Sequence, residues 1–447
     1  MLATDPLFSQ SVGLAVFIIV AIRALVAFGV LMVAVMLMIW FERKVISDMQ
    51  NRIGPNRAGP YGLLQSLADG IKLFFKEDLV PERSDRFVFK LAPYLATIPA
   101  FLTFAIVPIG GVVTIAHHTF ELQVADPPMG VLFVLAMSSI SVYGVMLAGW
   151  SSGSKYPLIG SIRATAQMIS YEAAVSLSVA TVVLVSVLSG ASFGTLSTRG
   201  IVVSQASNIF HWNLFRSGIV PFVIFMIAIT AELNRPPFDL VEAEQELVGG
   251  FHTEYSSIRF ALFFLAEFMN TITMSAIAVT FFFGGPDGPG FHFLTWLWPI
   301  LWFVGKTLIF LFCYVWVRAA LPRLRYDQLM DLGWKVLIPF SLGWLLVIGA
   351  IISTNKVVPA FLWGIGILVG CLLAYLLLSR AIKVGRSRSF DVRKTSLAGV
   401  EVGRFDLEDE DVVGGRIFDL PDSAEDDDFA VGPVLTPKHL LSIEDGE

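Results

Sequence analysis

Long apolar runs that recur along the chain constrain its fold more than any other feature of the sequence. An α-helix needs about 20 apolar residues to cross ~30 Å of hydrocarbon. Nine runs approach this length: roughly Val12–Trp40, Tyr94–Ala116, Gly130–Trp150, Ala173–Leu188, Ile219–Ala231, Phe260–Phe283, Leu297–Val317, Val336–Ile352 and Val358–Leu378. Only 15% of the 447 residues are charged, against about 25% in soluble proteins. The sequence therefore predicts an all-α, polytopic membrane protein with about nine transmembrane helices.

Lysine and arginine concentrate in alternate connections between these runs, and the other connections hold few. The basic connections contain Arg43, Lys44, Arg52, Arg57, Lys72, Lys76, Arg83, Arg86, Lys90, Lys155, Arg163, Arg235, Arg259, Arg318, Arg323, Arg325 and Lys335. Because basic connections stay on the cytoplasmic side, we expect the N-terminus outside, the C-terminal tail in the cytoplasm, and the chain in the plasma (inner) membrane.

An acid-rich loop, residues 232–257, separates the fifth and sixth runs. Asp239 and Glu242 have the spacing of a capping pair, which predicts a short helix that ends at Gly249. Asp239, Glu242 and Glu246 would then share one helix face. Carboxylates that close raise each other's pKa values and become plausible proton carriers. A solvated acidic helix is the alternative.

Residues 62–77 form an amphipathic stretch. Leu63, Leu67, Ile71 and Phe74 fall on one helix face, and polar residues including Asp69 fall on the other. Such a helix is expected to lie along the membrane interface. It either anchors the chain there or roofs an opening for a lipid-soluble ligand.

Ionisable residues also occur inside the apolar runs. Glu172 heads the fourth run, Glu267 lies in the sixth and Lys306 in the seventh. A charge at membrane depth is costly, so function is the first hypothesis for it. Together with Glu232 and the loop carboxylates, the two intramembrane glutamates are candidates for a connected polar path.

Cofactor chemistry is poorly represented in this chain. Cys313 and Cys371 are its only cysteines, too few for an iron–sulfur cluster, and the six histidines fall in loops or the tail, which argues against haem. A Gly-rich dinucleotide turn is absent. We expect no metal, flavin or haem bound by this chain, no NADH oxidation by the chain alone, and no nucleic-acid partner.

The composition changes after the ninth run. Residues 385–447 begin with basic residues and then become strongly acidic, which accounts for the net charge of -6. The sequence predicts a membrane domain, residues 1–384, and an acidic, disordered cytoplasmic tail, residues 385–447.

Five long motifs identify a family resemblance. They are FERK at 41–44, QNRIGPNRAGPYGLLQSLADGIKL at 50–73, LIGSIRATAQMISYE at 158–172, AELNRPPFDLVEAEQELVGGFHTEYSS at 231–257 and LPRLRYDQLMDLGWK at 321–335. The chain resembles the H-subunit family of bacterial respiratory NADH:quinone oxidoreductase (complex I), the counterpart of mitochondrial subunit 1.

The resemblance implies a membrane subunit of a proton-pumping translocase, with quinone as substrate. It implies partners: the soluble subunit with the terminal iron–sulfur cluster, a soluble quinone-site subunit, small membrane subunits of the proton path, and the lipid bilayer. Carried over by motif, the quinone-binding residues are Glu42, Arg43, Arg52 and Asp69, and the loop after the fifth run belongs to the same chamber. The proton-path residues are Glu172, Glu232, Asp239, Glu242, Glu244, Glu246 and Glu267, and their charge partners are Arg163 and Arg318.

One position departs from the family, which usually has tyrosine where Phe268 stands. Two other functions compete with complex I. The membrane subunit of an energy-converting hydrogenase shares the same loops. A stand-alone cation or proton transporter would explain Glu172, Glu267 and Lys306, but it leaves the long basic connections without a purpose, and no inverted repeat is evident.

Overall fold

A computed structural model describes residues 14–115, 118–188, 196–206, 208–239, 248–289, 296–353 and 380. These residues contain seven helices long and apolar enough to cross a membrane, and a shorter apolar helix, α8 (Ile219–Glu232). The long helices are α1 (Leu14–Met49), α3 (Arg86–Phe104), α4 (Gly130–Ser151), α5 (Lys155–Leu188), α10 (Ser257–Phe282), α11 (Leu297–Ala320) and the continuous segment that ends in α13 (Ile338–Ser353). The all-α polytopic prediction is confirmed.

Several predictions fall outside the described residues. They are the ninth run, the boundary between membrane domain and tail, most of the helix predicted after Asp239, and the side chains of Glu242, Glu244 and Glu246.

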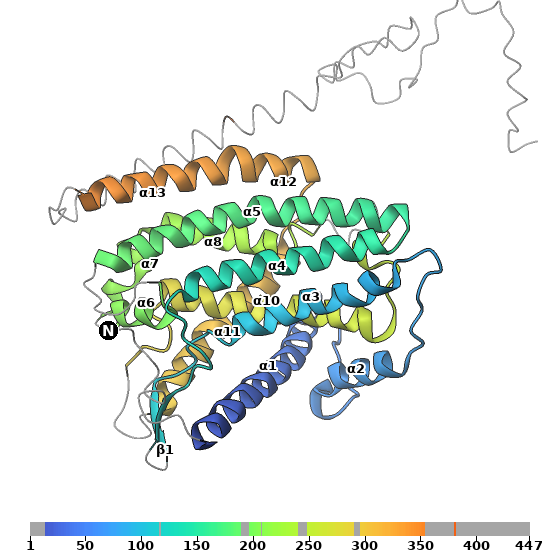
Figure 1. The fold of residues 1–447 in the computed structure, drawn as a ribbon, viewed down its shortest axis with the longest axis horizontal. Coiled ribbons are helices and arrows are strands. Elements are labelled where there is room, and N and C mark those ends of the chain that lie inside the picture. Colours follow the sequence, from blue (N-terminus) through green and yellow to red (C-terminus); the bar gives the residue numbers. More distant parts are fainter. Residues whose placement is uncertain are drawn as a thin grey trace, which may run out of the picture. The chain divides into compact units, whose positions relative to one another are not determined.

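The helices α3, α4 and α5 lie side by side in chain order, and α13 packs on the far side of α5 (Figure 1). Helix α8 packs against α5, and α10 contacts α3, α11 and α1. The second half of α10 is almost wholly buried, from Thr271 to Phe282, because other helices surround it. This helix forms the centre of the apolar core and carries Glu267.

The second span begins earlier than predicted. Asp85 accepts hydrogen bonds from the backbone N–H groups of Phe87 and Val88 and thereby caps α3. Pro93 and Pro99 both lie inside the helix. After α3 the chain forms an antiparallel hairpin of β1 (Val112–Ile115) and β2 (His118–Glu121), so the predicted span over 94–116 is wrong at both ends.

The fourth span is also longer than predicted. The segment 151–169, predicted as a connection, is helical from Lys155 onward. Pro157 lies in the first turn, where proline is tolerated, and no strong breaker follows it. The same error affects the connection 318–335: α12 (Tyr326–Leu332) and a π-helical segment, η5 (Gly333–Leu337), run directly into α13.

The predicted amphipathic helix is present as α2 (Gln65–Phe75). Leu67, Ile71 and Phe74 are exposed, whereas Asp69 and Ser66 bind α1, through Arg43 and the backbone carbonyl of Met36. The apolar face of α2 therefore points away from the described chain, as a helix at a lipid interface requires.

The remaining short elements are η2 (Pro60–Gly62), α6 (Thr198–Gln205), η3 (Ile209–His211), α7 (Asn213–Arg216) and η4 (Gly250–His252).

Candidate functional site

The first part of the site is a pocket of about 440 Å³, here called the arginine pocket. It lies between the end of α1, the glycine-rich loop after it, α10 and α11, and its lining includes Glu42, Arg43, Arg52, Glu267 and Arg318. Three of the four residues predicted to bind quinone therefore line one pocket.

The fourth predicted residue, Asp69, contacts the pocket wall from α2. Its carboxylate accepts a hydrogen bond of 2.7 Å from Arg43 Nη1. Partial burial raises the pKa of Asp69, but the hydrogen bond and charge of Arg43, helped by Lys72, outweigh it and hold that pKa below its ordinary value. Asp69 is therefore an anion that fixes Arg43.

A buried charge cluster forms the inner wall of this pocket. Arg235 Nη1 donates to both carboxylate oxygens of Glu42, at 3.2 and 3.0 Å, and Arg235 Nε lies 2.8 Å from Glu267 Oε1. Arg318 also pairs with Glu42. Glu42 and Arg235 are 4% and 5% exposed, so their charges require each other for compensation. Arg235 is not among the individually predicted site residues, although the family resemblance assigns its loop to the chamber and its position in the RPPFD motif is a usable signal.

Phe268 completes this cluster. The Arg235 guanidinium lies 4.3 Å from the centre of the Phe268 ring, within the range of a cation–π contact. The position that departs from the family pattern thus supplies an aromatic face to the arginine.

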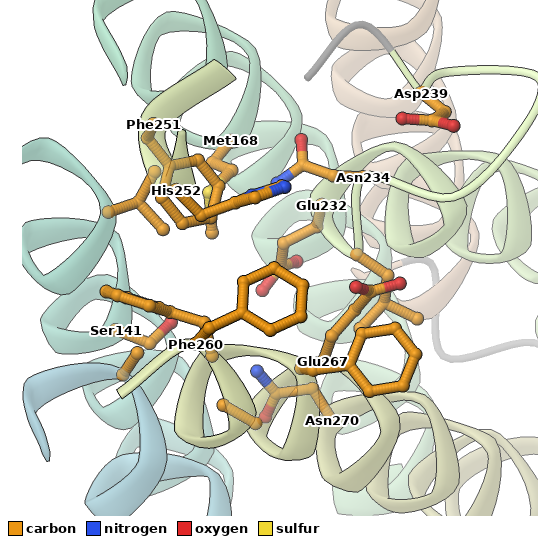
Figure 2. Close-up of a pocket in the computed structure, with 16 residues that line it drawn as sticks. Ser141, Met168, Glu232, Asn234, Asp239, Phe251, His252, Phe260, Glu267 and Asn270 are labelled. Carbon is orange, nitrogen blue, oxygen red and sulfur yellow. The ribbon is translucent and has the colours of Figure 1, made fainter. Parts of the chain in front are cut away.

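The second part of the site is a smaller cavity of about 90 Å³, here called the acidic cavity. Glu232 reaches it from the end of α8, Glu267 and Asn270 from α10, His252 from η4, and Asp239 from the loop (Figure 2). Glu267 lines both the acidic cavity and the arginine pocket. Three predicted proton-path residues are therefore brought together, and one of them borders the pocket with the predicted quinone-binding residues.

Two adjacent serines of α4 bind two of the predicted proton-path carboxylates. Ser138 donates a hydrogen bond to Glu232, and Ser139 donates to Glu172. The other carboxylate oxygen of Glu232 has no hydrogen-bond partner among the described residues, although Glu232 is 5% exposed. The serine pair was missed at the sequence level; its only signal is two polar residues in an apolar run.

The loop after α8 is fixed by contacts from α5 and the α11–α12 connection. Gln167 Nε2 donates to the backbone carbonyls of Ala231 and Phe238, at 2.7 and 2.8 Å. Arg323 lies 3.3 Å from the Asp239 carboxylate. These contacts hold Glu232 and Asp239 at opposite ends of one short, buried segment.

Two predicted charges lie elsewhere. The Arg163 guanidinium is 5.8 Å above the Tyr326 ring. Lys306 Nζ donates to the backbone carbonyls of Phe283, Gly285 and Asp287, at 2.8, 3.0 and 2.7 Å. Lys306 thus satisfies carbonyls just beyond the end of α10, which weakens its use as an argument for a transporter.

Metal ligation has no support in the described residues, where no three His, Cys, Asp or Glu side chains are grouped to hold an ion. The fold and the two cavities define a class: a polytopic membrane protein with a charged pocket at one helix end and an adjoining cavity lined by Glu232, Asp239 and Glu267.

Comparison with known proteins identifies the family. Residues 22–349 match the NADH dehydrogenase family. The chain is 50% identical over 370 residues to the H subunit of the NADH-quinone oxidoreductase of Frankia alni, covering 81% of this chain and 80% of the relative. It is 50% identical over 365 residues to the same subunit of Frankia casuarinae, covering 80% and 78%. The chain belongs to the H-subunit family of NADH-quinone oxidoreductase, a membrane component of complex I, as the motifs indicated.

Proposed function

We propose that this chain forms the entrance and part of the chamber for quinone, and that it couples quinone reduction to proton translocation through its carboxylates. In this proposal the arginine pocket receives the quinone headgroup beneath a soluble subunit that carries the terminal iron–sulfur cluster. Glu267, Glu232 and Glu172 begin the proton path, with the loop carboxylates beside them. The basic connections face the cytoplasm, and the chain itself binds no flavin, metal or haem.

One observation carries the proposal: Glu267 lines both cavities and is paired to Glu42 through Arg235. A negative charge that develops on the quinone headgroup would compete with Glu42 and Glu267 for Arg235. Since a carboxylate that loses a cationic partner binds a proton more tightly, Glu267 would then take up a proton. Its change in charge would act on Glu232 across the acidic cavity.

Helix α2 suits the entrance. Its apolar face is exposed and its polar face ends at Arg43, a pocket residue. A ligand that arrives from the lipid would pass the apolar side chains before it meets the charges.

The test is Glu232→Gln in the intact complex, reconstituted in liposomes. The hydrogen bond from Ser138 can persist, but the titratable carboxylate is lost. We expect either that quinone-dependent turnover falls by about 10²-fold or that turnover continues without building a proton gradient. NADH oxidation by ferricyanide, which needs no quinone site, is retained. Glu82→Gln, at an exposed position on the basic side, is the matched control. Full pumping by Glu232→Gln would overturn the proposed function.

A further inference from the structure

His252 lies at the acidic cavity in a position that the carboxylate path does not use. It is the last residue of η4 and lines the cavity together with Glu232, Asp239 and Glu267. Figure 2 shows its ring beside the amide of Asn234, across the cavity from Glu267 and Asn270. A titratable imidazole and three carboxylates thus border one small space.

Aromatic neighbours fix the orientation of the imidazole ring. The ring centres of Phe251 and Phe260 lie 5.1 and 5.4 Å from that of His252, both steeply inclined to it. The backbone of η4 packs tightly on α5, since a Cβ added at Gly160 would lie 2.8 Å from Gly250 Cα. His252 is therefore held at the cavity by packing on both its side chain and its backbone.

Two buried acceptors in the cavity wall have no donor in the part of the chain that the structure describes. Glu232 Oε2 and Asn234 Oδ1 have no hydrogen-bond partner among the described residues. Water needs roughly 10–15 Å³ of such space, so a cavity of about 90 Å³ has room for several molecules. Helices α3, α4 and α5 line it with Ala96, Ser141, Val145 and Met168; hence its described titratable groups are His252 and the three carboxylates.

We propose that His252 is a proton carrier of the acidic cavity, passing protons between the Asp239 side of the cavity and Glu232. This inference rests on the proposed function, because it assigns a further residue to the same path. Imidazolium gives the proton on its nitrogen to a cavity water, which delivers one to the Glu232 carboxylate. The products are neutral imidazole and a neutral carboxylic acid, so the net charge of the cavity is unchanged. The imidazole then takes a new proton from the Asp239 side of the cavity.

The physical advantage of histidine lies in its ordinary pKa of about 6.5, which lets it both accept and donate near neutral pH. Glutamine and asparagine make hydrogen bonds at the same place but do not titrate. A carrier therefore differs from a purely structural residue in its pH profile.

The experiment uses the whole complex in liposomes with a quinone analogue, assayed from about pH 5.5 to 8.5. In His252→Gln we expect proton-coupled turnover to fall about tenfold or more and the limb of the pH profile that reports the imidazole to disappear. In His252→Gly, added imidazole is expected to restore part of the rate. His211→Gln, in η3 and not at the cavity, is the matched control, and ferricyanide reduction checks assembly.

Two results would overturn the inference. One is a His252→Gln complex with unchanged rate and pH profile. The other is a lower rate with the profile unchanged in shape and no rescue by imidazole, because that outcome describes a packing role. If Glu232→Gln stops coupling while His252→Gln does nothing, only this inference fails. If Glu232→Gln pumps normally, the proposed function fails instead.

Discussion

Phe268 shows how a single side chain can tune a buried charge cluster. Its ring faces Arg235, which in turn holds Glu42 and Glu267. Phe268→Tyr keeps the aromatic face, so we expect quinone turnover within about twofold of the parent. Phe268→Leu removes the cation–π contact, worth about 0.5–2 kcal/mol, and is expected to raise the KM for quinone several-fold. Steady-state kinetics with a quinone analogue measure both effects.

Loss of packing must be separated from loss of the cation–π contact. Phe281, also on α10 and 1% exposed, packs against the Phe225 ring and lines neither the arginine pocket nor the acidic cavity. Phe281→Leu removes a buried ring outside the arginine pocket and the acidic cavity, so it is the control for the loss of packing alone. Equal KM values in Phe268→Leu and the parent would show that the ring does not support Arg235.

At the scale of helices, apolar runs predicted the spans, but they predicted the ends of only some of the helices. The boundaries of α8, α10 and α11 agree with the predicted runs within a few residues. The start of α3 depends on a capping aspartate, and the extension of α5 depends on buried polar partners such as Gln167. A hydropathy scale detects neither feature, because it scores each polar residue as unfavourable in an apolar helix. Caps and buried hydrogen bonds satisfy such polar groups, so the helix can include them.

The close contact between α5 and η4 leads to a prediction at this scale. A methyl group on Gly160 would lie 2.8 Å from Gly250 Cα and 3.2 Å from the backbone nitrogen of Phe251. Gly160→Ala must therefore displace η4 and the cavity wall that it forms. We expect quinone-dependent turnover to fall at least about tenfold, measured against ferricyanide reduction.

Gly343→Ala in α13, where an added Cβ meets nothing within 4 Å, is expected to retain normal turnover. Normal turnover in Gly160→Ala would show that η4 needs no fixed position.

At the scale of the whole molecule, the site joins residues that are far apart in sequence. Glu42 and Arg235 are separated by 193 positions, and Glu42 and Arg318 by 276. The motifs predicted Glu42 and Arg318 individually, and the distribution of lysine and arginine predicted a common side of the membrane for the connections that hold all three residues. It did not predict which pairs meet, since that depends on how α1, α10 and α11 pack, and packing leaves no local pattern.

The excess of lysine and arginine on one side of the chain predicts how the complex should come apart. If soluble subunits dock on these basic connections, their attraction is partly electrostatic and weakens when salt shortens the Debye length from about 10 Å at 0.1 M to about 3 Å at 1 M. A tag on this chain should therefore co-purify flavin, iron and NADH:quinone activity in mild detergent at low salt. A wash at about 1 M salt should remove the flavin, the iron and the activity together, while the tagged membrane chain stays bound to the affinity resin. A matched wash with an uncharged osmolyte should leave the activity in place. If the chain elutes without flavin or iron even at low salt, the assignment of its basic side as the docking surface is wrong.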